Sequence, residues 1–135
     1  MIVRELEAGD LDGIRLVLQQ ARQQAHIDRG EVPKGAVGAY SDKQLVAIAG
    51  FGFLDDGLAA WVLFTDAFKP HHMMEAFDAM RGTLNVWRKE GIKIYIRIEP
   101  SVPESLRLAR LLGFAFVGHD VVDGRPMERM IYDRR

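Results

Sequence analysis

The sequence predicts one α/β domain with about seven strands and three or four helices. Three observations support this prediction. Strand-like and helix-like patterns alternate in the order strand, helix, three strands, helix, strand, helix, two strands. The chain has 135 residues, of which 48% are hydrophobic and 27% are charged, values typical of a single compact domain. It contains no cysteine, and a chain of this length buries enough surface to form a core without disulfides.

The first half of the chain predicts a strand, a helix and an antiparallel meander. Residues 2–6 form a short apolar strand. Gly9-Asp10 then supplies an N-cap, and apolar residues recur at helical spacing over 11–25. The polar stretch 26–34 contains a glycine and a proline, which predicts a loop or a short second helix. Three strands joined by tight turns follow, over residues 36–40, 45–53 and 58–65.

The second half predicts two helices and three strands. Apolar residues at steps of four and three place a helix over 73–87. Strict alternation over 92–98 indicates a strand with one polar face. Prolines then open a helix that ends at Gly113. The last two strands, 114–121 and 127–132, flank the hairpin turn Asp123-Gly124.

Composition excludes several classes of function. The net charge of −1, from 18 basic and 19 acidic residues, gives no basic surface for non-specific nucleic-acid binding. No apolar run reaches the roughly 20 residues of a membrane span, and the first residues do not resemble a signal peptide. The lack of cysteine excludes thiol catalysis and thiolate metal sites. We therefore expect a cytoplasmic protein.

Two passages resemble the GNAT superfamily of acyl-CoA-dependent N-acyltransferases. Residues 2–12 (IVRELEAGDLD) look like its first strand and helix start, and residues 105–114 (SLRLARLLGF) look like its fourth helix and the Gly-Phe that enters the sixth strand. The resemblance implies a single GNAT-like domain over 1–135 with a mixed, mostly antiparallel sheet. It also implies a wedge between the fourth and fifth strands, where the acyl-CoA of that family lies.

The sequence departs from the GNAT pattern at two positions. The family holds the cofactor pyrophosphate on a glycine-rich loop, because a Cβ would keep the phosphate away from the backbone N–H groups. The corresponding residues 66–76 (DAFKPHHMMEA) contain no glycine. Many members also use a tyrosine to protonate the leaving thiolate, and Ala109 stands at that position. Neither Tyr95 nor Tyr132 occupies the motif position.

A closer resemblance accounts for both departures. Residues 60–66 (AWVLFTD), the helix that carries Met80-Arg81 and residues 105–114 look like the internal virion protein A family of short-tailed, T7-like bacteriophages. This implies a phage or prophage protein without catalytic activity that assists assembly of the virion or its ejection apparatus. Its partners would be other virion or phage proteins, in the bacterial cytoplasm or in the virion, and no cofactor is expected. Phe64, Phe68 or Met73 would then fill the wedge.

The alternative is an active N-acyltransferase that moves an acyl group from acetyl-CoA or another acyl-CoA to an amine. Glu99 or Asp66 would then accept the amine proton. The residues that would hold the cofactor are Leu63, Thr65, Lys69, His71 and His72. For the two carboxylates we favour the simpler interpretation, a cross-strand ion pair or a solvated sheet end.

The histidines do not predict a metal site. His71 and His72 are adjacent, so on a helix they point about 100° apart, and we expect an exposed helix start. His119 and Asp120 face opposite sides of a strand, which makes direct pairing of the two unfavourable. We expect a homodimer, since members of the superfamily often pair.

Overall fold

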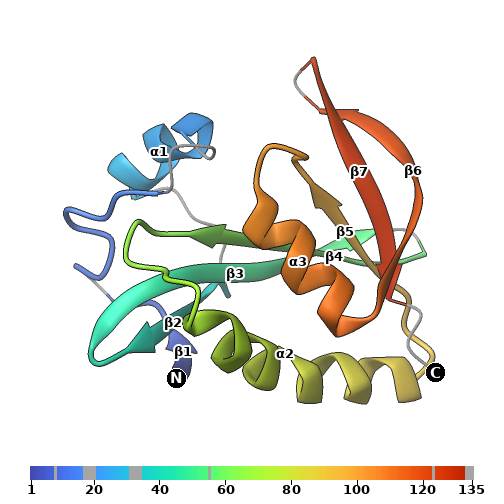
Figure 1. Cartoon of the computed structure of the whole chain (residues 1–135), viewed down its shortest axis with the longest axis horizontal. Helices are drawn as coiled ribbons and strands as arrows, with labels where there is room; N and C mark the ends of the chain where they lie inside the picture. Colours follow the sequence, from blue (N-terminus) through green and yellow to red (C-terminus); the bar gives the residue numbers. More distant parts are fainter. Residues whose placement is uncertain (8, 17–20, 31–34, 55, 123, 133–135) are drawn as a thin grey trace. The chain divides into compact units, whose positions relative to one another are not determined.

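The computed structural model describes every residue except 8, 17–20, 31–34, 55, 123 and 133–135. Within this described part the chain forms seven strands and three helices, in the order that the sequence predicts (Figure 1). The elements are β1 (Ile2–Glu5), α1 (Ala21–Asp28), β2 (Val37–Ser41), β3 (Gln44–Leu54), β4 (Gly57–Phe64), α2 (His72–Lys89), β5 (Ile94–Ile98), α3 (Pro103–Leu112), β6 (Phe114–Val122) and β7 (Arg125–Tyr132).

The strands form one mixed sheet with the order β1-β2-β3-β4-β5-β7-β6. The pairs β1–β2, β2–β3, β5–β7 and β6–β7 are antiparallel. The pair β4–β5 is parallel, and its register runs from Leu58 opposite Ile94 to Ala60 opposite Ile96. The predicted mixed, mostly antiparallel sheet is therefore confirmed.

The chain divides into two compact units, which we call unit 1 and unit 2. Unit 1 consists of Met1–Gly50 and Val62–His72, and unit 2 of Phe51–Trp61 and Met73–Arg135. Strands β3 and β4 each contribute residues to both units. The expectation of a single domain over the whole chain remains a prediction.

In unit 1 the predicted start of the first helix is wrong. Residues 9–13 form turns instead, because Gly9 and Gly13 adopt φ angles of 87° and 72°, which a right-handed helix cannot contain. The side chain of Asp10 caps this turn by accepting a hydrogen bond from the N–H of Glu7 at 2.7 Å. Leu16 then pairs with Thr65 as an isolated antiparallel bridge. Of the helix predicted over 11–25, the structure shows only the part that belongs to α1, and residues 17–20 lie outside the described part.

Asp10 also anchors β1 to β2. The hydroxyl of Tyr40 donates a hydrogen bond to Asp10 at 2.7 Å, and the guanidinium of Arg4 donates one at 3.2 Å. The guanidinium carbon of Arg4 lies 4.0 Å from the centroid of the Tyr40 ring. Burial and then the bond to Asp10 raise the pKa of Tyr40 to about 12. This cluster holds the amino-terminal segment in place.

In unit 2 the alternating strand has one buried face. Ile94, Ile96 and Ile98 are buried, whereas Tyr95 and Arg97 keep solvent access. The strand begins two residues later than the sequence predicts, because the N–H of Ile92 donates a hydrogen bond to the carbonyl of Trp87 at the end of α2. The predicted glycine cap of α3 is confirmed, since Gly113 has a φ of 105°.

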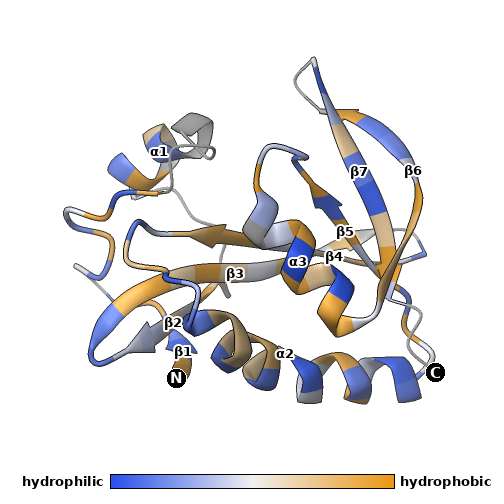
Figure 2. Cartoon of the chain, in the orientation of Figure 1, coloured by the Kyte–Doolittle hydropathy of each residue, from blue (hydrophilic) through white to orange (hydrophobic). Residues whose placement is uncertain are grey.

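The helix α2 is amphipathic. Figure 2 shows hydrophobic and hydrophilic residues along its whole length. Met73, Ala76 and Leu84 are buried, while Met74 and Asp78 are exposed. None of the described helices is both long and apolar enough to cross a membrane.

Candidate functional site

The turn between β4 and α2, residues 65–71, contains most of the predicted cofactor contacts, and Thr65 holds it together. Thr65 is 1% exposed. Its hydroxyl donates a hydrogen bond to the carbonyl of Leu45 at 2.9 Å and accepts one from the N–H of Ala67 at 3.2 Å. Its carbonyl accepts the N–H of Phe68 at 3.1 Å. The polar groups of Thr65 therefore bind the turn to β3 and close the turn itself.

His72 caps the start of α2, and the expectation that it is exposed is wrong. Its Nδ1 accepts the N–H of Lys69 at 2.8 Å, and its own N–H donates to the carbonyl of Lys69 at 2.9 Å. The ring is buried and lies 5.6 Å from the ring of Phe68. An accepting Nδ1 places the proton of the neutral ring on Nε2. The N–H of Lys69 is taken by His72 and Pro70 has no N–H, so neither position can donate to a phosphate.

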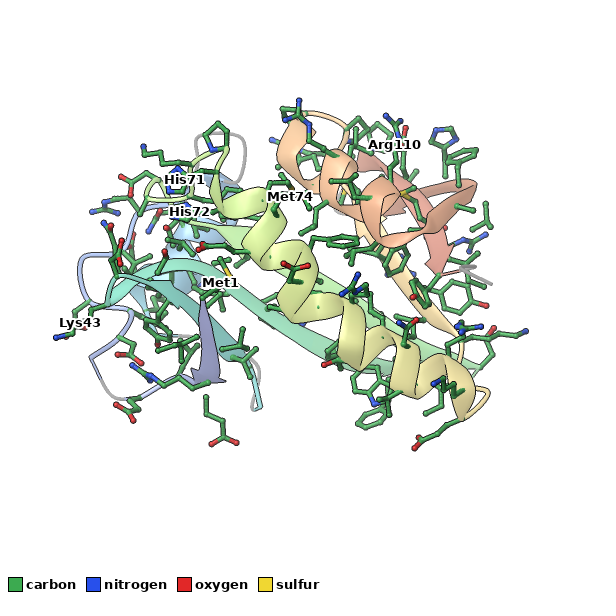
Figure 3. The ribbon with its side chains drawn as sticks, turned by 60° about the horizontal axis from the view of Figure 1, so that its bottom comes forward. Met1, Lys43, His71, His72, Met74 and Arg110 are labelled. Carbon is green, nitrogen blue, oxygen red and sulfur yellow. The ribbon has the colours of Figure 1, made fainter. Side chains whose placement is uncertain are left out.

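Two of the exposed side chains of the turn are basic. Lys69 and His71 both face solvent, as the sequence predicts for His71. The ammonium of Lys69 donates a hydrogen bond to the carbonyl of Asp66 at 3.1 Å, and the rings of His71 and His72 lie 4.0 Å apart (Figure 3). Both side chains stand at the amino-terminal end of a helix, where its dipole favours an anion. The turn therefore presents side chains, rather than a glycine cradle, to a negatively charged group.

The apolar residues expected to fill the wedge are buried. Phe64 and Phe68 lie in unit 1 with ring centroids 4.5 Å apart, and they are 0% and 8% exposed. Met73, in unit 2, is 6% exposed. Leu63 is half-buried. The wedge itself remains a prediction, because the ends of β4 and β5 belong to different units.

The two candidate bases have different environments. Glu99 accepts a hydrogen bond from the guanidinium of Arg125 at 2.9 Å, and its side chain is only 11% exposed. The ion pair favoured by the sequence analysis is therefore present. Asp66 is exposed, and its backbone N–H donates to the carbonyl of Arg15 at 2.8 Å. Glu99 and Asp66 lie in different units, so their roles as bases remain predictions.

The described tyrosines of unit 2 have structural partners. The hydroxyl of Tyr95 donates to Asp56 at 2.8 Å, and this hydrogen bond raises the pKa of Tyr95. The hydroxyl of Tyr132 donates to Asn85 at 2.7 Å. Ala109, at the position of the family's acid, is 2% exposed in the packed face of α3.

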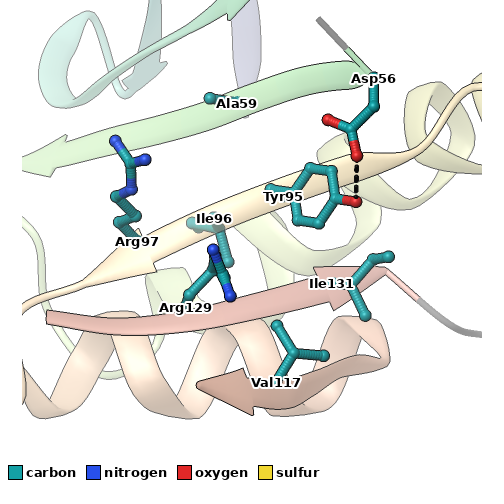
Figure 4. Close-up of a pocket in the computed structure, with 8 residues that line it drawn as sticks. All are labelled: Asp56, Ala59, Tyr95, Ile96, Arg97, Val117, Arg129 and Ile131. Atoms are coloured by element: carbon teal, nitrogen blue, oxygen red, sulfur yellow. Dashed lines mark hydrogen bonds between the residues drawn. The ribbon is translucent and has the colours of Figure 1, made fainter. Parts of the chain in front are cut away.

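A pocket on the polar face of unit 2 escaped the sequence analysis. It has a volume of about 410 Å³, and its lining comes from Asp56 just before β4, from β4 itself and from β5, β6 and β7 (Figure 4). Its cations are Arg97 and Arg129, and both contact Asp120. The sequence indicated this pocket only through the polar face of the alternating strand, since Arg129, the residue opposite Arg97 on the neighbouring strand, lies more than thirty residues away in the chain.

His119 and Asp120 contact different groups among the described residues. Asp120 pairs with two arginines, and the ring of His119 lies 5.0 Å from that of Phe116. Among the described residues no group of three or more histidine, aspartate or glutamate side chains is placed to hold a metal ion.

No protein-family model and no curated protein matches this sequence, but solved structures do. AAC(6')-Ib in complex with ribostamycin and coenzyme A matches with a TM-score of 0.65 and 14% identity, covering 98% of this chain and 92% of that one. A GNAT-family acetyltransferase from Bacillus anthracis matches with a TM-score of 0.63 and 13% identity, over 96% and 91% of the two chains. A mutant of the spermidine N-acetyltransferase from Vibrio cholerae matches with a TM-score of 0.60 and 16% identity, covering 97% of this chain and 94% of that one.

The chain has the GNAT fold. The GNAT-like fold expected from residues 2–12 and 105–114 is therefore confirmed, although residues 9–13 form turns and not the start of a helix. Nothing in these comparisons supports the resemblance to phage internal virion proteins. Because a GNAT fold is compatible with more than one function, these matches show the fold and do not by themselves show an activity.

Proposed function

We propose that this protein is an N-acyltransferase that moves an acyl group from acyl-CoA to an amine. The observation that carries the proposal is the GNAT fold along nearly the whole chain, with its parallel β4–β5 pair. One of the similar structures contains coenzyme A, which weighs against the earlier expectation that no cofactor is bound. Others are spermidine N-acetyltransferases, so a polyamine is a suitable first acceptor to test.

The turn at the start of α2 would contact the cofactor through side chains. Lys69 and His71 are exposed there, and each can pair with a phosphate oxygen. The backbone contributes less than in a glycine-rich loop, because the N–H of Lys69 already donates to His72. Thr65 holds the turn, and Leu63 on β4 would lie along the cofactor. This arrangement predicts weaker binding of acyl-CoA than a glycine-rich loop provides.

The transfer needs one base and one proton for the leaving group. The amine nitrogen bonds to the thioester carbonyl carbon, the carbon–sulfur bond breaks, and the amine proton passes to a carboxylate, directly or through water. Asp66 and Glu99 are the candidates for that carboxylate. The thiolate takes its proton from water, because Ala109 occupies the position of the family's tyrosine.

Release of the coenzyme A thiol tests the proposal directly. Ellman's reagent reports free thiol, and a chain without cysteine gives no background. We expect thiol release from acetyl-CoA that depends on spermidine or another polyamine. We also expect a thermal shift, since a hundredfold excess over Kd stabilises a fold by about 2.7 kcal/mol. The double variant Lys69→Ala/His71→Ala should lose most of both signals, while Lys89→Ala, which removes a lysine at the other end of α2, should keep them.

A second candidate function is favoured by the contact between His72 and Lys69. This bond closes the turn on itself, as expected if the cofactor site has degenerated. The protein would then act by contact with other virion or phage proteins, or as a homodimer. The absence of both thiol release and a thermal shift at millimolar acetyl-CoA would favour this candidate and overturn the first.

A further inference from the structure

The polar face of unit 2 places two arginines directly opposite each other. Arg97 on β5 pairs in register with Arg129 on β7, so both side chains leave the same face of the sheet. Their side chains are 49% and 42% exposed. Like charges opposite each other on neighbouring strands destabilise a sheet. Such a pair is therefore unexpected unless an anion lies between or beside the two guanidiniums.

Among the described residues, one carboxylate contacts these two cations. Asp120 on β6 accepts a hydrogen bond from Nε of Arg97 at 2.8 Å and lies 3.5 Å from Nη1 of Arg129. The Nε of Arg129 is buried and has no hydrogen-bond partner among the described residues. Asp120 thus balances one of the two charges at this end of the pocket, and the described carboxylate of the lining, Asp56, lies at the other end, where it accepts the hydrogen bond of Tyr95.

The rest of the pocket combines apolar surface with an aromatic ring. Ala59, Val117 and Ile131 contribute apolar side chains, and Val117 is 46% exposed. The ring of Tyr95 is restrained by its hydrogen bond to Asp56, at the end of the pocket away from Arg97 (Figure 4). The volume of about 410 Å³ is within the range of small-molecule sites. A ligand with an anionic head and a hydrocarbon body matches this lining.

We propose that this pocket binds a small organic carboxylate, with the carboxylate at Arg97 and Arg129 and the hydrocarbon part on Val117 and Ile131. The planar guanidinium groups match carboxylate geometry and form charge-assisted hydrogen bonds. The carboxylate belongs either to a free acid or to the carboxyl terminus of a peptide. All of these residues lie in unit 2, and the proposal does not depend on acyltransferase activity.

Titration with benzoate, followed by NMR of the 15N-labelled and methyl-labelled protein, tests the site. We expect saturable shifts of the Nε–H signals of Arg97 and Arg129 and of the methyl signals of Val117 and Ile131. Benzamide, the neutral analogue, should cause at most a tenth of the response, because it lacks the charge. A short peptide with a free carboxyl terminus, compared with its amide, shows whether the carboxylate can belong to a peptide. Failure of benzoate to saturate in the tens of millimolar, or equal binding of benzamide or inorganic phosphate, would overturn the proposal.

Variants distinguish a binding role from a structural one. Arg129→Gln should weaken benzoate binding at least tenfold and still fold, because it also removes a like-charge contact. Asp120→Asn should bind benzoate more tightly, since it removes the carboxylate that competes for both arginines. Arg125→Gln is the matched control, because Arg125 is on the same strand but pairs with Glu99. Equal weakening in Arg125→Gln, or weaker binding in Asp120→Asn, would contradict the assignment.

Discussion

Replacing Thr65 by valine tests whether the turn before α2 depends on a single hydroxyl. Valine keeps the shape of the side chain but removes the donor to Leu45 and the acceptor for Ala67. A buried group left without its partner costs about 1–3 kcal/mol. The carbonyl of Leu45 is in a fully buried bond, whereas the N–H of Ala67 is only part-buried. We therefore expect Thr65→Val to lower the free energy of unfolding by about 2–4 kcal/mol.

The matched control is Thr65→Ser, which keeps the hydroxyl and removes one methyl group. Thr65→Ser should lower the free energy of unfolding by about 1 kcal/mol, because one buried methyl group is lost. Urea unfolding followed by the fluorescence of the two tryptophans measures both values. With a slope of about 2 kcal/mol per molar urea, the valine variant should unfold at a urea concentration about 1–2 M lower than the wild type. A valine variant as stable as the serine variant would show that packing, and not the hydroxyl, holds the turn.

Three further predictions concern stability. Gly57→Ala should lower the free energy of unfolding by at least about 2 kcal/mol, because its Cβ would overlap the backbone carbonyl of Lys93, just before β5. Gly52→Ala, whose Cβ would have nothing within 4 Å, should lower it little in the same urea unfolding assay. Gly82→Ala on the exposed side of α2 should raise the free energy of unfolding by about 0.5–1 kcal/mol, and a lower melting temperature would contradict this. The hydrogen bond from the N–H of Glu7 holds the pKa of Asp10 below its ordinary value, so its stabilisation is present at neutral pH and is lost as the pH falls through the folded-state pKa. Asp10→Asn should flatten the acid limb of the melting temperature against pH, and an unchanged limb would assign the dependence to other groups.

Part of the candidate site was predictable because it follows from local chemistry. The missing glycines of residues 66–76 and the alanine at position 109 are visible in the sequence and remain departures in the structure. The capping role of His72 was not predictable, because it depends on the ring turning back to a backbone N–H three residues earlier. An ion pair was expected for Glu99, but its partner Arg125 was not predictable, because it depends on the register of strands that are distant in the chain.

The sequence by itself determined the elements whose pattern is local. Alternation set the buried face of β5, apolar spacing set α2, and Gly113 ended α3, because each depends on residues a few positions apart. Features that depend on pairing between residues distant in the chain were decided only by the tertiary structure. Leu16 forms a β-bridge with Thr65 where a helix was expected, and Arg97 lies opposite Arg129 on the neighbouring strand. Such contacts depend on strand register, which the packing of the whole sheet selects and no short segment encodes.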